Sequence, residues 1–377
     1  MSKKICIISN GYPTNDDPEY AFIQPVARAF ADEGKECIVI APQSWTKYKL
    51  TKKKKRPYRW IDKTNKGNVV IIYQPEYLSL STIKIFKRNV SILLRDCAIE
   101  RCFKKEEIEP DVLYAHFWDC GIVACKLAKK NNTPVFVASG ESRIRVFNYY
   151  KKSKIVKSLP YIKGVVCVST KNLAESRNFG LLQFNPKTLV LPNAINPQEF
   201  YSIPKDKARK ILGYKIEDRI AIFVGTFCHR KGVLRVIQAV EKIESLKLIL
   251  IGSGEQEAKS DRIIFSGKVP HDKIYLYLNA ADVFVLPTLA EGCCNAIVEA
   301  LACGLPIVSS NLSFNKDILN ESNSIMINPE NIDEIAVALD QIINDEALQT
   351  ILSKGALLSV KELTIDQRCK KILAFLN

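Results

Sequence analysis

The sequence predicts an α/β protein built from two doubly wound domains, each a parallel sheet with helices on both faces. Short apolar runs rich in β-branched residues alternate with helix-like stretches along the 377 residues. Nearly continuous apolar strands are typical of parallel sheets, because such sheets are buried on both faces. Thirteen runs of this kind are too many for one ordinary open sheet, and the chain length suits about two domains.

The predicted strands are short and are separated by predicted helices. In the first half, strands are expected over residues 4–9, 37–41, 69–73, 112–115, 135–138, 165–168 and 188–191. In the second half, they are expected over residues 220–224, 246–251, 263–265, 283–286, 307–309 and 324–327. Amphipathic stretches predict helices over residues 23–33, 121–130, 233–243 and 333–344.

The boundary between the domains is expected near residues 191–206, which contain three prolines and no strong periodicity. We assign residues 1–195 to an N-terminal domain, 196–361 to a C-terminal domain and 362–377 to a final helix. Residues 1–190 contain 34 Lys and Arg against 17 Asp and Glu, whereas the rest contain 21 against 23. A basic half suits a polyanion or an anionic membrane face, although a lysine-rich solvated surface would give the same count.

Several features are absent from the sequence. No apolar stretch approaches the ~18–20 residues of a membrane span, and the first residues read as a strand rather than a secretion signal. The twelve cysteines include no Cys-x-x-Cys pair, and only three histidines accompany them, which argues against a zinc site. We therefore expect reduced cysteines in a cytoplasmic protein.

Residues 82–105 predict a basic amphipathic helix. Its apolar positions are Ile83, Phe86, Val90, Leu93 and Leu94, and its basic positions are Lys84, Lys87, Arg88 and Arg95. Such a helix can lie on anionic lipid, or it can dock on its own sheet with a solvated basic back, and the sequence leaves both readings open. The lysine-rich residues 47–66 are expected to form an exposed loop.

The segment LPTLAEGCCNAIVEALACGLPIV, residues 286–308, predicts an anion site at a helix start. An apolar strand ends at Pro287, and a helix is expected from near Asn295 to about Cys303 with Gly304 as its stop. Ligands of doubly wound sheets bind beyond the carboxyl ends of the strands. The N–H groups that would face such a ligand belong to Gly292, Cys293, Cys294, Asn295 and Ala296.

Two carboxylates flank this anion site. Glu291 precedes it, and Glu299 follows at most ~12 Å further along if the segment is helical. A carboxylate is a poor neighbour for phosphate but a good acceptor for sugar hydroxyls. The pattern therefore fits a nucleotide-sugar, which has hydroxyl-bearing rings at both ends of a diphosphate. A dipole-favoured glutamate followed by a solvated one would fit the spacing equally well.

Two other strand ends supply cations and glycines. The run FVGTFCHRKGV, residues 223–233, carries Arg230 and Lys231, which would meet the charge of a diphosphate. The run LILIGSGE, residues 248–255, ends in a turn with Gly252 and Gly254 that allows close backbone approach. Neither run has the dinucleotide fingerprint or the P-loop pattern, which disfavours a nicotinamide oxidoreductase.

In order and spacing, these motifs resemble those of the retaining glycosyltransferases of glycosyltransferase family 4, which have the two-domain GT-B fold. The E-x7-E motif runs from Glu291 to Glu299, VGTFCHRKG matches the G…KG loop, and residues 265–287 match the approach to the first glutamate. The resemblance covers nearly the whole chain and is strongest from Val165 on. It implies two Rossmann-like domains that face a cleft, with the final helix returning to the N-terminal domain.

The resemblance also implies a role for each matching residue. Glu291 would contact the hydroxyls of the donor sugar, Glu299 would accept those of the ribose, and Lys231 with Arg230 would neutralise the diphosphate. His116 would lie near the transferred sugar and act in catalysis with Glu291 and Lys231. Further donor-binding positions are Gly225, Thr226, Gly252, Gly254, the base-pocket residues Lys268 and Val269, and Gly292, Cys293, Cys294, Asn295 and Ala296; the acceptor side would include Asn10, Gly11, Tyr12 and Glu141.

Three departures from the family pattern bear on these roles. Thr226 stands where arginine is frequent, and Arg230 is the candidate to replace it. The loop after the first strand lacks the usual glycine pair and contains Asp16 and Asp17. The sequence SGES at residues 139–142 stands where His-Gly is common. The last two departures concern the acceptor side.

The implied reaction is transfer with retention, in which the acceptor hydroxyl attacks the face that the diphosphate leaves. No Asp-x-Asp motif lies near the diphosphate site, so we expect no metal and no cofactor, only a nucleotide-sugar donor, for which uridine is the family's most frequent base. The expected acceptor is a lipid-linked or other glycan of a bacterial surface polysaccharide, handled at the inner face of the cytoplasmic membrane.

Two other classes of function fit part of the pattern. A nucleotide-sugar epimerase would share the two-domain fold but would need no acceptor. A nucleic-acid-binding module would use the basic half, but the aromatic residues are not interleaved with the basic run. We therefore expect no nucleic-acid partner.

Overall fold

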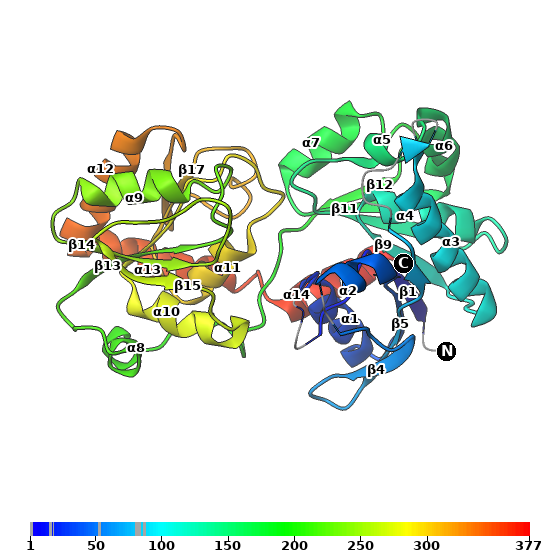
Figure 1. Cartoon of the computed structure of the whole chain (residues 1–377), viewed down its shortest axis with the longest axis horizontal. Helices are drawn as coiled ribbons and strands as arrows, with labels where there is room; N and C mark the ends of the chain where they lie inside the picture. The colour runs from blue at the N-terminus through cyan, green and yellow to red at the C-terminus, as the bar shows by residue number, and fades with distance from the viewer. Residues whose placement is uncertain (1–2, 15–16, 18, 52–53, 80–83, 86–87) are drawn as a thin grey trace. The chain divides into compact units, whose positions relative to one another are not determined.

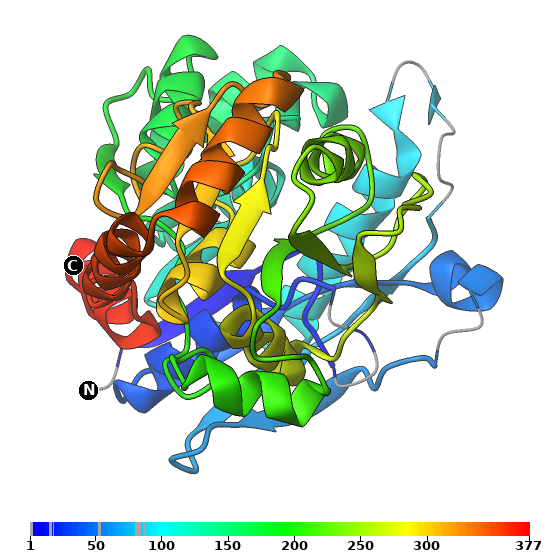
Figure 2. The same ribbon diagram turned by 90° about the vertical axis from the view of Figure 1, so that its left-hand side faces the viewer.

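The computed structural model describes residues 3–14, 17, 19–51, 54–79, 84–85 and 88–377 (Figure 1). The chain divides into two compact units. We call residues 1–191 with 369–377 the N-terminal unit and residues 192–368 the C-terminal unit. Each unit is an open sheet between layers of helices, so the predicted pair of doubly wound parallel sheets is confirmed (Figures 1 and 2).

The N-terminal unit is built on an eight-stranded sheet. Its strands are β1 (Lys4–Ile8), β2 (Glu36–Ile40), β4 (Arg59–Lys63), β5 (Val69–Tyr73), β9 (Val112–His116), β10 (Val135–Ser139), β11 (Ile162–Cys167) and β12 (Lys187–Val190). Their order is β12-β11-β10-β9-β1-β2-β5-β4, and all neighbours are parallel except β4, which runs antiparallel to β5 at the edge. Two short pairs lie outside this sheet, β3 (Gln43–Ser44) with β6 (Glu76–Tyr77) and β7 (Lys84–Ile85) with β8 (Arg88–Asn89).

The helices of this unit are α1 (Ile23–Asp32), α2 (Trp45–Thr51), α3 (Val90–Lys105), α4 (Trp118–Ala128), α5 (Val146–Tyr149), α6 (Lys152–Ser158), α7 (Thr170–Asn178) and the end of α14 (Ile365–Phe375). Residues of α3, α4 and α6 share a core with one face of the sheet. Phe375 of α14 packs against the ring of Phe136 at 5.8 Å and lies over Gly164, where a Cβ would meet it at 2.7 Å. The last turns of α14 therefore belong to this unit, as the family resemblance implies.

The C-terminal unit has a six-stranded, fully parallel sheet. Its strands are β13 (Arg219–Val224), β14 (Leu246–Ile251), β15 (Ile263–Gly267), β16 (Val283–Leu286), β17 (Ile307–Ser310) and β18 (Ser324–Ile327), in the order β15-β14-β13-β16-β17-β18. The helices are α8 (Lys205–Leu212), α9 (Val233–Glu241), α10 (Ile274–Ala280), α11 (Asn295–Ala302), α12 (Ile332–Asn344) and α13 (Glu346–Val360). Helices α9 and α12 cover one face of the sheet, and α10, α11 and α13 cover the other (Figure 1).

All thirteen predicted strands are present, with ends shifted by at most three residues. The prediction of an exposed loop over residues 47–66 was wrong, because α2 and β4 fall within it. Strand β4 buries one side chain, Asp62, which accepts hydrogen bonds from Arg28 Nη2 at 2.6 Å and Tyr12 Oη at 2.6 Å. An antiparallel edge strand needs to bury only one face, so it lacks the continuous apolar run that marks the central strands.

The prediction of one helix over residues 82–105 was also wrong. Helix α3 begins only at Val90, after Asn89 caps it by accepting a hydrogen bond from Ile92 N at 3.3 Å. Arg95 is 3% exposed and therefore cannot contact lipid. The predicted apolar and basic positions Ile83, Phe86 and Lys87 lie outside the described residues.

A buried ion pair joins α8 to the first residues of β13 and to the residue before β16. Asp282 Oδ2 accepts hydrogen bonds from Arg209 Nη2 at 2.8 Å and from the backbone N–H of Ile220 at 2.7 Å, and Oδ1 pairs with Lys205. Arg209 also donates to the carbonyl oxygen of Ala280 at 2.9 Å. Because Arg209 is itself buried, removing its carboxylate partner would leave an uncompensated charge inside the unit.

We expect Asp282→Ala to lower the free energy of unfolding of the C-terminal unit by about 3 kcal/mol. The measurement is urea unfolding followed by far-ultraviolet circular dichroism. Asp333→Ala is the matched control, because its ion pair with Lys242 is solvent-exposed and its loss should be within error. Tryptophan fluorescence should not shift in either variant, since Trp45, Trp60 and Trp118 all lie in the N-terminal unit. Equal losses in the two variants would contradict a larger contribution from the buried ion pair.

Candidate functional site

Strand order places the candidate site of the C-terminal unit beyond β13 and β16. Strands β13 and β14 are joined through α9, and the chain then returns to pair β16 on the other side of β13. The order reverses at this point, and ligands of doubly wound sheets bind where it reverses, at the carboxyl ends of the strands. The two loops that leave this edge are residues 225–232 after β13 and residues 287–294 after β16.

A carboxylate of one loop pairs with two cations of the other. Glu291 Oε1 lies 2.6 Å from Lys231 Nζ and 2.6 Å from Arg230 Nη1, and it accepts a hydrogen bond from Thr288 Oγ1 at 3.1 Å. Leu289 N also donates to the carbonyl oxygen of Arg230 at 2.8 Å. All three side-chain donors use Oε1, and no donor to Oε2 is found in the described part of the chain.

The negative charge of Glu291 and the positive charges of Lys231 and Arg230 stabilise each other. Burial opposes ionisation of Glu291, but the charges of Lys231 and Arg230 outweigh it and hold the pKa of the carboxyl below its ordinary value. Burial likewise disfavours the Lys231 ammonium, but the charge of Glu291 and its hydrogen bond to Lys231 help to raise the pKa of Lys231. Both groups are therefore ionised at neutral pH, and Lys231 is a fixed positive charge beside the start of α11.

Arg235 on α9 is a residue that the sequence analysis did not identify. Its Nη2 donates to the carbonyl oxygen of Pro287 at 2.9 Å, and its Nη1 donates to that of His229 at 3.1 Å. It therefore binds both loops from below the cluster. No motif marks Arg235, because both of its acceptors are backbone atoms that any sequence supplies.

Helix α11 begins at Asn295 and ends at Ala302, and Gly304 follows with a φ of 73°, as predicted. Its N-cap, Cys294, makes no side-chain capping bond. Among the described residues, the backbone N–H groups of residues 292–296 have no hydrogen-bond acceptor. Asn193 holds the turn from outside, through Nδ2 to the carbonyl oxygen of Cys293 at 3.1 Å. The first turn thus keeps donors for an anionic ligand.

The second carboxylate, Glu299, is held by a histidine. His271 Nε2 lies 3.3 Å from Glu299 Oε1. No motif marks His271, because it lies in a polar segment 28 positions before Glu299. Only the fold brings the short helix at residues 271–273 within reach of Glu299.

The glycines that follow β14 are explained by packing within the protein itself. Gly252 has a φ of 144°, and a Cβ on it would lie 1.9 Å from the carbonyl oxygen of Gly225. A Cβ on Gly254 would lie 2.1 Å from the carbonyl oxygen of Phe227. These glycines let the loops after β13 and β14 touch. Two of the predicted donor-binding residues follow β15, exposed Lys268 and half-buried Val269, and β14 separates that strand from β13. Thr226 is exposed and lies next to Gly225 in the chain.

We expect Gly252→Ala to lower the free energy of unfolding of the C-terminal unit by about 2 kcal/mol or more, because the new Cβ meets backbone in a conformation that alanine disfavours. Gly267→Ala is the matched control. Gly267 is the last residue of β15, and its carbonyl oxygen accepts the N–H of Gly252 at 2.8 Å. A Cβ on Gly267 has room, because its nearest neighbour would be 3.7 Å away. Urea unfolding by circular dichroism compares the two variants, and similar midpoints would contradict the steric account.

In the N-terminal unit, His116 ends β9 and is buried. Its ring packs edge-on against Tyr114 at 5.2 Å and lies 6.0 Å from the ring of Phe22. The next residue, Phe117, has a φ of 74°, which is unusual for a residue with a side chain. This conformation turns the chain directly from β9 into α4.

Glu141 binds the start of the same helix. Its Oε1 accepts the N–H of Trp118 at 2.8 Å, and its Oε2 accepts the hydroxyl of Ser139 at 3.0 Å. Burial raises the pKa of Glu141 to about 7. Glu141 therefore caps the start of α4.

A buried polar network lies behind the loop that follows β1. Arg95 Nη1 donates to Asn10 Oδ1 at 2.6 Å and pairs with Asp119, while Nη2 donates to Asp96 Oδ1 at 2.8 Å. Tyr150 Oη donates to Asp96 Oδ2 at 2.9 Å. The network fixes the Asn10 side chain, so Asn10 presents a defined surface to the adjoining cavity.

That cavity has a volume of about 610 Å³. Its lining comes from the loop after β1, from α2 and from the start of α3, and it includes Asn10, Gly11, Lys47, Leu50, Arg56 and Arg95. Of the predicted acceptor-side residues, Asn10 and Gly11 thus line a cavity. Tyr12 is not among the lining residues: its side chain is fully buried and its hydroxyl binds Asp62.

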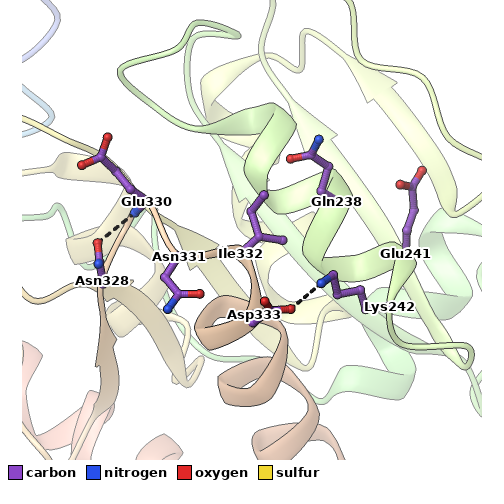
Figure 3. Close-up of a pocket in the computed structure, with 8 residues that line it drawn as sticks. All are labelled: Gln238, Glu241, Lys242, Asn328, Glu330, Asn331, Ile332 and Asp333. Carbon is purple, nitrogen blue, oxygen red and sulfur yellow. Dashed lines mark hydrogen bonds and ion pairs between the residues drawn. The ribbon is translucent and has the colours of Figure 1, made fainter.

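A second hollow, of about 730 Å³, lies between α9 and the start of α12 (Figure 3). Its lining residues bond mainly to one another, as when Asn328 Oδ1 accepts the N–H of Glu330 at 3.1 Å and Lys242 pairs with Asp333. None of the predicted site residues lines it. We assign it no ligand.

Comparisons with known proteins point to one family. Residues 204–357 match the family described as Glycosyl transferases group 1. The chain is 28% identical to UDP-Gal:alpha-D-GlcNAc-diphosphoundecaprenol alpha-1,3-galactosyltransferase of Escherichia coli, over 71% of this chain and 75% of the relative. It is 23% identical to N,N'-diacetylbacillosaminyl-diphospho-undecaprenol alpha-1,3-N-acetylgalactosaminyltransferase of Campylobacter jejuni, over 94% of each.

Solved structures share the fold over the whole chain. Sucrose-phosphate synthase from Thermosynechococcus elongatus has a TM-score of 0.79 at 18% identity, covering 99% of this chain and 98% of that one. HepE of Anabaena, solved in complex with UDP-glucose, has a TM-score of 0.68 at 14% identity, covering 99% of both chains. At these identities the likeness concerns the fold alone, with two parallel-sheet, Rossmann-like domains.

Proposed function

We propose that the chain is a group 1 glycosyl transferase, that is, a family 4 enzyme, and that it moves a hexose-type sugar from a nucleotide-sugar to a lipid-linked glycan with retention. One observation carries the donor half of the proposal: Lys231, Arg230 and Glu291 meet beside the open N-terminus of α11, where the strand order reverses. Cations and oriented N–H groups suit a diphosphate leaving group.

Each part of the donor has a proposed partner. The N–H groups of residues 292–296 and Lys231 would hold the diphosphate, and Glu291 Oε2 would accept a hydroxyl of the sugar. Glu299 would accept the ribose hydroxyls, and Lys268 and Val269 would border the base. Arg230 would take the place of the family's arginine at Thr226. UDP-glucose bound to HepE is the structural precedent for a uridine donor.

In the proposed reaction, the acceptor hydroxyl forms the new bond on the face from which the diphosphate departs, and its proton passes to a diphosphate oxygen. Lys231 and the N–H groups would stabilise the negative charge that develops there. This scheme needs positioning and charge rather than a metal ion or a protein nucleophile. His116, at the end of β9, would contribute from the N-terminal unit.

We expect a nucleotide-sugar from a panel of UDP-, GDP- and ADP-sugars to raise the melting temperature of the wild-type protein, because a ligand at 100 times its Kd stabilises by about 2.7 kcal/mol. Lys231→Ala and Glu299→Ala should each abolish that rise, measured from each variant's own melting temperature. Lys242→Ala, an exposed lysine of the same unit, is the control and should keep it. Unchanged shifts in both site variants would refute the donor assignment.

For the acceptor, we propose the cavity of the N-terminal unit. Both relatives above carry diphospho-undecaprenol in the names of their acceptors. A lipid diphosphate brings negative charge and a long apolar chain, and the cavity is bordered by Lys47 and exposed Leu50. The product would extend a bacterial surface polysaccharide.

We propose a peripheral contact with anionic lipid through α2. Within the described residues, no helix is long and apolar enough to cross a membrane. Helix α2 instead exposes Leu50 at 84% and Trp45 at 38%, and Lys49 lies 4.2 Å over the Trp45 ring. Basic and aromatic side chains around an exposed leucine are typical of helices that lie on a membrane surface.

We expect Lys49→Glu/Leu50→Glu to lower binding to phosphatidylglycerol vesicles about tenfold or more in a flotation assay. The matched control makes the same chemical change on α13, as Lys354→Glu/Leu358→Glu, at two exposed positions of the C-terminal unit. The control should bind like the wild type. If the wild type does not float, or if both variants lose binding equally, the contact does not lie on α2.

A further inference from the structure

His271 lies between two carboxylates from different segments. Its Nε2 is 3.3 Å from Glu299 Oε1 on α11, and its Nδ1 is 3.9 Å from Glu199 Oε2 in the segment before α8. Glu199 is held in turn by Asn196 Nδ2 at 2.8 Å. The imidazole also packs edge-on against the buried ring of Phe200 at 5.1 Å, so its position is set by contacts other than hydrogen bonds.

The protonation state decides whether both contacts are favourable. Neutral imidazole has one N–H, so one of its nitrogens would present a lone pair to a carboxylate. Imidazolium has two N–H groups, so it can donate to Glu299 through Nε2, while its positive charge attracts Glu199, which at 3.9 Å is too far for a hydrogen bond. The third charged group beside the ring, Asp272 on the same short helix, is also acidic. Every facing group therefore favours the charged form.

We propose that protonated His271 is a positioning residue for the donor: it binds Oε1 of Glu299 and thereby turns Oε2 toward the ribose hydroxyls, so that donor affinity falls as His271 loses its proton. No described residue donates to Glu299 Oε2, which leaves this atom for the ligand. This inference rests on the proposed function, because it assigns Glu299 to the ribose.

The titration of His271 sets the direction in which donor affinity changes with pH. The hydrogen bond with Glu299, followed by the charges of Glu299 and Glu199, raises the pKa of His271 above its ordinary value. The contribution to donor affinity is therefore fully present below about pH 6.5 and is lost as the pH rises through the raised pKa.

The test measures binding of UDP-, GDP- and ADP-glucose by calorimetry between about pH 5.5 and pH 8.5, a range in which their diphosphates carry no titrating proton. In the wild type, affinity for the preferred probe should fall about tenfold with rising pH. His271→Gln keeps a donor to Glu299 without a titrating group, so its affinity should stay high and flat. His271→Phe keeps the packing on Phe200 but no donor, so its affinity should be low and flat.

A second measurement tests the pair without any donor. The protein has three histidines, so their ring signals can be resolved by nuclear magnetic resonance. Glu299→Gln should lower the pKa of His271, and the ring signals of exposed His229 serve as the internal reference. An unchanged His271 pKa overturns the inference.

The binding results separate the two proposals. If the probes bind the wild type but His271→Gln and His271→Phe keep the wild-type pH slope, the role of His271 is overturned and the proposed function stands. If none of the three probes binds the wild type, the proposed function fails and the assignment of Glu299 to ribose fails with it.

Discussion

The ion pair between Glu291 and Lys231 is the interaction on which the C-terminal site depends. It joins the loops that leave β13 and β16, and Arg230 adds a second cation to the same oxygen. A largely buried lysine or glutamate alone would lose much of its charge, but together both stay ionised. Arg235 supports the same loops from beneath through backbone carbonyl oxygens. The positive charge beside α11 is thus held in place by the fold.

In the N-terminal unit, too, buried charges are compensated by partners of opposite charge. Arg95 is buried and satisfied by Asn10, Asp96 and Asp119. Its charge is compensated inside the unit, as is that of Arg56, which pairs with Asp17 at 3.1 Å. The basic count of this half therefore overstates what its surface presents. Lys49 of α2 remains exposed, which is why the proposed lipid contact moves to α2 from the segment first predicted.

The sequence predicted the sheets well because their signal is local. A strand buried on both faces must be apolar at nearly every position, so β1, β13, β14 and β16 are visible as runs. Helix α11 was predicted close to its observed bounds, because Pro287 and Gly304 bracket it. Strand β4 was missed because it lies at an edge, and α3 was placed too early because a helical spacing of apolar residues continued into the segment before Asn89.

The sequence alone determined the two-sheet architecture, the loops that carry Lys231 and Glu291, and the anion-binding start of α11, since each depends on residues close together in the chain. Tertiary structure decided which side chains meet: Arg235 with the backbone of Pro287, Tyr12 with Asp62, and His271 with Glu299. These partners are separated by between 28 and 52 positions. Such contacts leave no periodic pattern, because strand order and helix packing bring them together.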